Sequence, residues 1–90
     1  MELNKEELKK ELKQVIVKTC RKKNDPATIP DDVPLIGKDT FLELDSLDVL
    51  ELSAVLLKNY GLRMMDSKDA FRMMKSIDVL ADTILSLKKS

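Results

Sequence analysis

Leu44-Asp45-Ser46-Leu47-Asp48 is the stretch near the middle of this chain where a proline-containing segment gives way to an amphipathic helix. Ser46 stands at that boundary, with acidic residues before and after it. A hydroxyl at the start of a helix is exposed, and a phosphate attached to it would lie among free backbone N–H groups at the positive end of the helix dipole. The stretch therefore predicts a helix start and marks Ser46 as suited to carry a phosphodiester.

Length and composition indicate a single domain over residues 1–90 with an aliphatic core. Apolar residues make up 43% of the chain but aromatic residues only 3%, so aliphatic side chains and five methionines must fill the core. Sixteen basic residues balance sixteen acidic residues, which leaves no overall field to attract nucleic acid or an anionic membrane. We therefore expect no nucleic-acid partner, and local charge to select protein partners.

Cysteine and histidine usage excludes several chemistries. Cys20 is the one cysteine, so no internal disulfide can form, and the absence of histidine leaves no plausible zinc site. The opening residues are charged rather than apolar, and no apolar run approaches the length of a bilayer span. The sequence thus predicts a metal-free, monomeric, cytoplasmic protein without a membrane span.

Apolar periodicity predicts three long helices and one short helix. They are expected over about 4–23, 46–59, 67–74 and 77–88, with a long loop over 24–45. Asp45 is the natural N-cap of the second helix, Gly61 its C-cap, and Ser76 the cap of the last helix. No strand alternation occurs, so the predicted fold class is all-α, a small antiparallel-type four-helix bundle.

The loop over 24–45 combines structure-breaking residues with apolar ones. It holds all three prolines and Gly37, and loops of this length are often functional. Its expected anchors in the core are Ile29, Val33, Leu35, Ile36, Phe41 and Leu42. We predict a long, packed loop that delivers the chain to Ser46.

Catalysis by this chain finds little support in its residues. Without histidine, neither a Ser-His-Asp nor a Cys-His nucleophile system can be assembled, and serine alone is a poor nucleophile. Carboxylate pairs are plentiful, but solvated faces explain them better than acid–base catalysis. We predict a non-catalytic protein with no catalytic residues. By local pattern alone, Ser46 is first a helix cap.

The residues around Ser46 nevertheless match a known pattern. The stretch resembles the attachment motif of acyl carrier proteins and related phosphopantetheine-binding domains, in which Asp-Ser-Leu is followed by an acid, an apolar residue and Glu. The matching residues are Asp45, Ser46, Leu47, Asp48, Leu50 and Glu51. The order of elements is also similar, including a helix that ends near Tyr60-Gly61, so the resemblance covers nearly the whole chain.

The resemblance implies that a phosphopantetheinyl transferase moves 4′-phosphopantetheine from coenzyme A onto the Ser46 hydroxyl. The terminal thiol of this covalent cofactor would then carry acyl groups as thioesters to acyl-transferring and acyl-modifying enzymes, as in fatty acid biosynthesis. A long flexible arm lets one acyl group reach several active sites at high effective concentration. The implied function is that of an acyl carrier protein.

Two alternatives stay open at this point. A peptidyl, aryl or D-alanyl carrier protein would use the same attachment and differ only in its cargo. In a different class, the chain is an unmodified helical interaction module, in which Asp45 and Ser46 merely cap a helix and apolar grooves bind a partner helix.

Candidate partner-recognition residues surround the motif. Asp45, Asp48 and Glu51 fall three residues apart along one side of the predicted helix, where they would meet Arg and Lys on partner enzymes. Compensation of the helix dipole accounts equally well for the first two. Leu47 and Leu50 are further candidate contacts, although helical spacing favours a core position for Leu50.

The sequence departs from the family pattern in two places. The acidic recognition face of the family continues into its short third helix, whereas this chain carries basic residues there and nearby, at Lys58, Arg63, Lys68, Arg72 and Lys75. The glycine that commonly precedes the family's Asp by two residues is replaced by Glu43. These departures favour a specialised carrier as much as a housekeeping one.

Three further groups of side chains have a simple structural interpretation. Met64, Met65, Met73 and Met74 are expected to fill an irregular core, and alternatively to admit an acyl chain between helices. Cys20 lies on the apolar face of the first helix and is expected to be a buried small hydrophobe. The lysines of that helix indicate a solvated face, and include Lys9, Lys10, Lys13 and Lys18.

Overall fold

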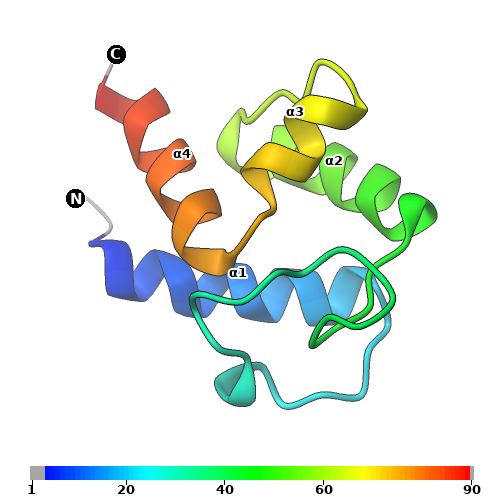
Figure 1. Ribbon diagram of the computed structural model, residues 1–90. Coiled ribbons are helices and arrows are strands. Elements are labelled where there is room, and N and C mark those ends of the chain that lie inside the picture. The colour runs from blue at the N-terminus through cyan, green and yellow to red at the C-terminus, as the bar shows by residue number, and fades with distance from the viewer. Residues whose placement is uncertain (1–3, 90) are drawn as a thin grey trace.

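The computed structural model describes residues 4–89, which form four α-helices and one short 3₁₀ turn (Figure 1). The elements are α1 (Lys5–Thr19), η1 (Pro26–Thr28), α2 (Ser46–Tyr60), α3 (Ser67–Met73) and α4 (Ile77–Lys89). Within this range the only β-type pairing is an isolated bridge between Ile36 and Leu44. The prediction of a small all-α bundle with three long helices and one short helix is confirmed.

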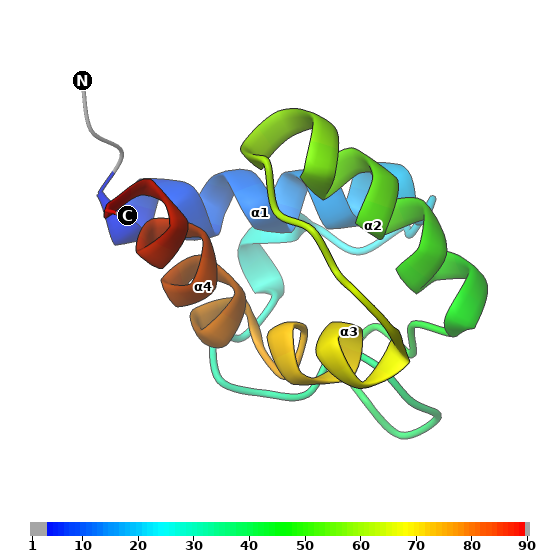
Figure 2. The same ribbon diagram turned by 90° about the horizontal axis from the view of Figure 1, so that it is seen from above.

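α1 contacts most of the other elements. It packs against α4, α2 and η1, and α3 packs against α4 (Figure 1). Seen from above, the connection 61–66 runs from the end of α2 to the start of α3, with the two helices on either side of it (Figure 2). None of the helices over residues 4–89 has the length and apolar content needed to cross a membrane.

One face of α1 supplies the centre of the core. Leu8, Leu12, Ile16 and Cys20 recur every four residues, and all four are buried. The expectation of a buried Cys20 is therefore confirmed. Neighbouring helices contribute further buried side chains to the same cluster, namely Leu52, Leu56, Met74, Ile77, Leu80, Ala81 and Ile84.

α1 ends at Thr19, which makes the predicted end near residue 23 wrong. Arg21 adopts a left-handed conformation with a φ of 54°, and its N–H donates to the Lys18 carbonyl over 3.4 Å. The N–H of Lys22 then donates to the Val17 carbonyl over 3.0 Å. These two bonds form a Schellman motif, which satisfies the last carbonyls of the helix and turns the chain away before the proline is reached.

Two lysines of α1 are not part of a solvated face, contrary to the sequence prediction. Lys9 Nζ lies 2.9 Å from Asp31 Oδ2, and Lys13 Nζ lies 2.6 Å from Asp31 Oδ1. Lys9 is buried as a residue, with 7% exposure, because its stem packs along the protein before reaching the carboxylate. Hydrogen bonds from Lys13 and then Lys9 lower the pKa of Asp31.

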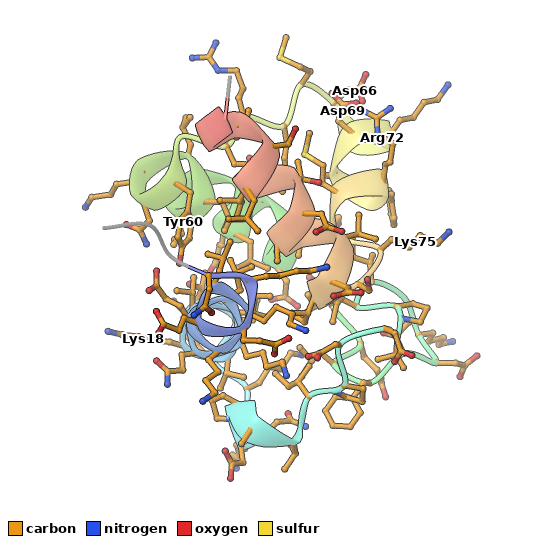
Figure 3. The ribbon with its side chains drawn as sticks, turned by 90° about the vertical axis from the view of Figure 1, so that its left-hand side faces the viewer. Lys18, Tyr60, Asp66, Asp69, Arg72 and Lys75 are labelled. Atoms are coloured by element: carbon orange, nitrogen blue, oxygen red, sulfur yellow. The ribbon has the colours of Figure 1, made fainter. Side chains whose placement is uncertain are left out.

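Asp31 also ties the long loop to α4. Its carbonyl accepts a hydrogen bond of 2.9 Å from the Asp78 N–H in the first turn of that helix. On the other side of α1, the Tyr60 hydroxyl at the end of α2 donates to Glu11, and Figure 3 shows Tyr60 pointing toward α1. Burial, with help from Glu11, raises the pKa of Tyr60. These polar contacts fix the loop and both flanking helices on α1.

The loop is packed, as predicted, although not by all of the expected residues. Ile29, Leu35 and Leu42 are buried, whereas Phe41 is 42% exposed and the prediction that it anchors the loop is wrong. Leu44 is also buried. The remaining two expected anchors are partly buried, at Val33 and Ile36.

Candidate functional site

Ser46 is the first residue of α2, and the cap of that helix is its neighbour. The Asp45 carboxylate accepts a hydrogen bond of 2.9 Å from the Asp48 N–H, and the Asp48 carboxylate accepts one of 3.2 Å from the Asp45 N–H. This reciprocal capping box confirms Asp45 as the N-cap. The side chain of Ser46 is exposed and forms no hydrogen bond with any residue of the described range. The hydroxyl is therefore not used to start the helix.

The end of the long loop holds Ser46 in place. The Leu44 N–H donates to the Leu35 carbonyl over 3.1 Å, and the Leu44 carbonyl accepts from the Gly37 N–H over 3.1 Å. With its side chain also buried, Leu44 anchors the chain two residues before the serine. Ser46 thus projects from a fixed point of the backbone.

Glu43 adopts a conformation that favours glycine. Its φ is 51°, in the left-handed region, and its N–H donates to Thr40 Oγ1 over 3.1 Å. This is the position at which the resemblance led us to expect glycine. The left-handed backbone gives a physical reason why a glycine suits this place.

A pocket of about 250 Å³ lies directly beside Ser46, between α2 and α3. Its lining is mostly apolar and consists of Ser46, Val49, Leu50, Ser53, Met64, Asp66, Ala70 and Phe71. Of the methionines singled out in the sequence, Met64 lines this pocket, Met73 is partly buried and Met74 is fully buried. Met65 is 73% exposed, so the core interpretation is wrong for that residue.

Sequence reasoning missed the α3 side of the pocket. Ala70 and Phe71 belong to a helix of seven residues with poor periodicity, so no pattern showed which of its sides would face α2. Phe71 was the available signal, because a large aromatic side chain outside a clean apolar face is a candidate for a pocket wall.

The acidic residues of the motif already have partners within the chain. Lys22 Nζ lies 3.9 Å from Asp48 Oδ2, and Arg21 Nη1 lies 3.7 Å from Glu51 Oε1. The predicted row of Asp45, Asp48 and Glu51 therefore borders the end of α1. Two of its three carboxylates are partly neutralised there.

The apolar residues of the motif face the solvent. Leu47 and Leu50 are each 68% exposed, so the prediction of a core position for Leu50 is wrong. α2 is apolar on two sides, and the side that faces α1 is formed by Leu52 and Leu56, which are fully buried. The candidate role of Leu47 and Leu50 in partner contacts remains compatible with their exposure.

Cys20 is poorly suited to act as a nucleophile. Burial, followed by the nearby charge of Asp48, raises its pKa to about 12. The group therefore stays protonated near neutral pH, and a thiol rather than a thiolate is a weak nucleophile.

The start of α2 has backbone donors suited to a phosphodiester on Ser46. The hydroxyl is exposed, and the backbone N–H groups of Ser46 and Leu47 donate to no other residue of the described range. Such free donors at a helix start bind phosphate oxygens. The carboxylates of Asp45 and Asp48 would repel a phosphate group, most strongly one with two negative charges. Lys22, which pairs with Asp48, offsets part of that repulsion. The donor set fits a single phosphodiester.

Comparison with models of known protein families finds no match for this sequence, and comparison with curated protein sequences finds none either. The resemblance to carrier proteins therefore depends on the motif residues and on the order of the elements.

Proposed function

We propose that this protein is an acyl carrier protein of the cytoplasm, with 4′-phosphopantetheine covalently attached to Ser46. The observation that carries the proposal is the division of roles at the start of α2, where Asp45 caps the helix and the Ser46 hydroxyl is exposed and unbonded. A serine needed only for capping would bond the backbone N–H groups itself. The attached thiol would supply the thioester chemistry of the carrier.

The residues of the chain position the acceptor hydroxyl and do not activate it. Leu44 and the capping box fix the backbone on both sides of Ser46. With no histidine in the sequence, no neutral imidazole is available to remove the hydroxyl proton. In the proposed reaction, a phosphopantetheinyl transferase removes this proton while the Ser46 Oγ–phosphorus bond forms, the pyrophosphate bond of coenzyme A breaks and adenosine 3′,5′-bisphosphate leaves. The chain itself is then the substrate of the transfer, not a catalyst.

The pocket beside Ser46 supports the same proposal. Its walls are largely apolar, and two of its polar groups, Ser46 and Ser53, lie about two turns apart on α2. An apolar group delivered from Ser46 would find such walls within a short reach and would be removed from water there.

Intact-mass measurement tests the attachment directly. The protein incubated with coenzyme A and a phosphopantetheinyl transferase is expected to gain the mass of one arm, and Ser46→Ala is expected to gain none. Ser53→Ala is the matched control, because Ser53 lines the same pocket in the next turns of α2. Circular dichroism of both variants confirms that each is folded. A wild-type protein that is folded and keeps its original mass contradicts the proposal.

The cargo distinguishes the members of the carrier class. Acyl, peptidyl, aryl and D-alanyl carriers share the attachment, so the thioester released from natively modified protein identifies which one this chain is.

A second candidate function is favoured by the exposed apolar side chains. Leu47, Leu50 and Phe71 give α2 and α3 an apolar surface suited to a partner protein even without a prosthetic group. In that case the chain is an unmodified interaction module. A partner complex that forms equally well with Ser46→Ala, together with an unmodified wild-type mass, distinguishes this function from the first.

A further inference from the structure

An exposed apolar patch extends over α2, α3 and the connection between them. It consists of Leu47, Leu50, Leu57, Met65 and Phe71, which are 68%, 68%, 45%, 73% and 58% exposed. The three leucines are spaced by three and seven residues, so they lie along one side of α2. Leu50 and Phe71 line the same pocket, which joins that side of α2 to α3. A set of large exposed apolar side chains on one side of a small protein marks an interaction surface.

Three acidic residues near the patch have an ion-pair partner within the chain. Asp48 and Glu51 have Lys22 and Arg21 as ion-pair partners at 3.9 and 3.7 Å. On α3, Asp69 pairs with Arg72 at 2.6 Å, and Figure 3 shows these two side chains close to Asp66. Asp66 itself caps α3 by accepting the N–H of Asp69 over 2.9 Å. The charges of Asp48, Glu51 and Asp69 are therefore partly balanced within the chain.

Basic residues without an ion-pair partner border the patch instead. Lys68 lies three residues before Phe71 in α3. Lys75 follows the end of α3, and Figure 3 shows it projecting away from the body of the molecule. Lys58 follows Leu57 at the end of α2, and Arg63 lies in the connection before α3. Within residues 4–89, none of these four cations has a carboxylate within ion-pair distance.

We propose that the apolar patch binds a protein partner whose contact surface has an apolar centre edged by carboxylates. The apolar side chains would be buried at the centre of the interface, and the unpaired cations on its rim would select acidic partners and speed their association. The inference depends on the surface alone and holds whether or not Ser46 is modified.

Two synthetic amphipathic helical peptides test this proposal. Both carry leucine along one face, and they differ only in having glutamate or lysine along the edges of that face. With ¹⁵N-labelled full-length protein, the glutamate-edged peptide is expected to shift amide signals of α2 and α3 and to bind at least about tenfold more tightly than the lysine-edged peptide. The combined substitution Lys68→Glu and Lys75→Glu is expected to reverse this preference.

Matched variants separate the patch from general effects of charge and hydrophobicity. Leu50→Ser is expected to weaken binding of the glutamate-edged peptide about tenfold, whereas Leu87→Ser, which alters an exposed leucine on α4, leaves it unchanged. The combined substitution Lys10→Glu and Lys18→Glu makes the same change of net charge on α1, away from α3 as Figure 3 shows for Lys18, and keeps the preference.

Three results overturn the proposal. The first is that the wild-type protein binds the lysine-edged peptide as tightly as the glutamate-edged one or more tightly. The second is that it binds neither peptide. The third is that sedimentation shows a dimer that dissociates on Leu50→Ser substitution. The last result assigns the patch to a second copy of the chain. The mass measurement on Ser46 is independent of all three, so failure of the carrier function and failure of this proposal are distinguishable.

Discussion

The two halves of this small bundle differ in how far their apolar side chains are buried. Where α1 meets α4 and the long loop, side chains such as Leu12 and Ile16 are fully buried and the charged groups are paired through Asp31. Where α2 meets α3, large apolar residues such as Leu50 and Phe71 stay in water beside a pocket. Both halves are apolar in sequence. The first half therefore contributes more to stability, and the second half keeps large apolar side chains exposed.

The largest expected effect compares the same substitution in the two halves. Leu12→Ala removes fully buried atoms from the core and is expected to lower the free energy of unfolding by about 2–5 kcal/mol. Leu50→Ala removes mostly exposed atoms and is expected to change it by less than about 0.5 kcal/mol. Urea unfolding followed by circular dichroism measures both. Comparable losses would mean that the contrast between the halves does not exist.

The paired charges of the first half predict a dependence on pH. Because the folded-state pKa of Asp31 lies below its ordinary value of 3.8, its ion pairs stabilise the fold at and above that pH. This contribution is lost as the pH falls through the lowered pKa. Asp31→Asn is therefore expected to lower the thermal midpoint at neutral pH, with the difference from wild type narrowing in strong acid. Asp32→Asn, at an exposed neighbour, is the control, and a constant difference across the pH range contradicts the assignment.

In the second half, a smaller effect is expected from comparing the helix cap Asp45 with its neighbour Ser46. Asp45→Ala removes the helix cap and is expected to cost about 1 kcal/mol. Ser46→Ala removes a hydroxyl without a hydrogen bond in the described range and is expected to stay within about 0.5 kcal/mol of wild type. Thermal and urea unfolding of the unmodified proteins measure both changes. A larger loss of unfolding free energy for Ser46→Ala than for Asp45→Ala would mean that the serine caps the helix.

The smallest expected effect is a gain of stability at the loop that delivers Ser46. Glu43→Gly relieves the left-handed backbone and is expected to raise the free energy of unfolding by about 0.5–1 kcal/mol. Glu43→Ala keeps the unfavourable conformation and serves as the control. If the alanine variant gains as much as the glycine variant, removal of the carboxylate is responsible and not the backbone.

Short-range hydrogen bonds at helix ends allowed the start of α2 to be predicted from the sequence. The predicted caps Asp45 and Ser76 are confirmed, because an N-cap needs only a side-chain oxygen and N–H groups two or three residues away. Gly61 ends α2 with a φ of 72°, as its freedom from a Cβ allows. The placement of Ser46 at the start of a helix follows from these short-range rules alone.

Tertiary structure decided what the spacing of residues left ambiguous. The sequence gives α2 two apolar sides, and only the approach of α1 selects Leu52 and Leu56 for burial and leaves Leu50 in water. Lys9 resembles any surface lysine until Asp31, which is distant in sequence, is folded against it. The sequence by itself thus determined the helices, their caps and the exposed serine, since these depend on neighbours along the chain. Which apolar faces are covered and which charges are paired was decided by packing, because those contacts join residues that only the fold brings together.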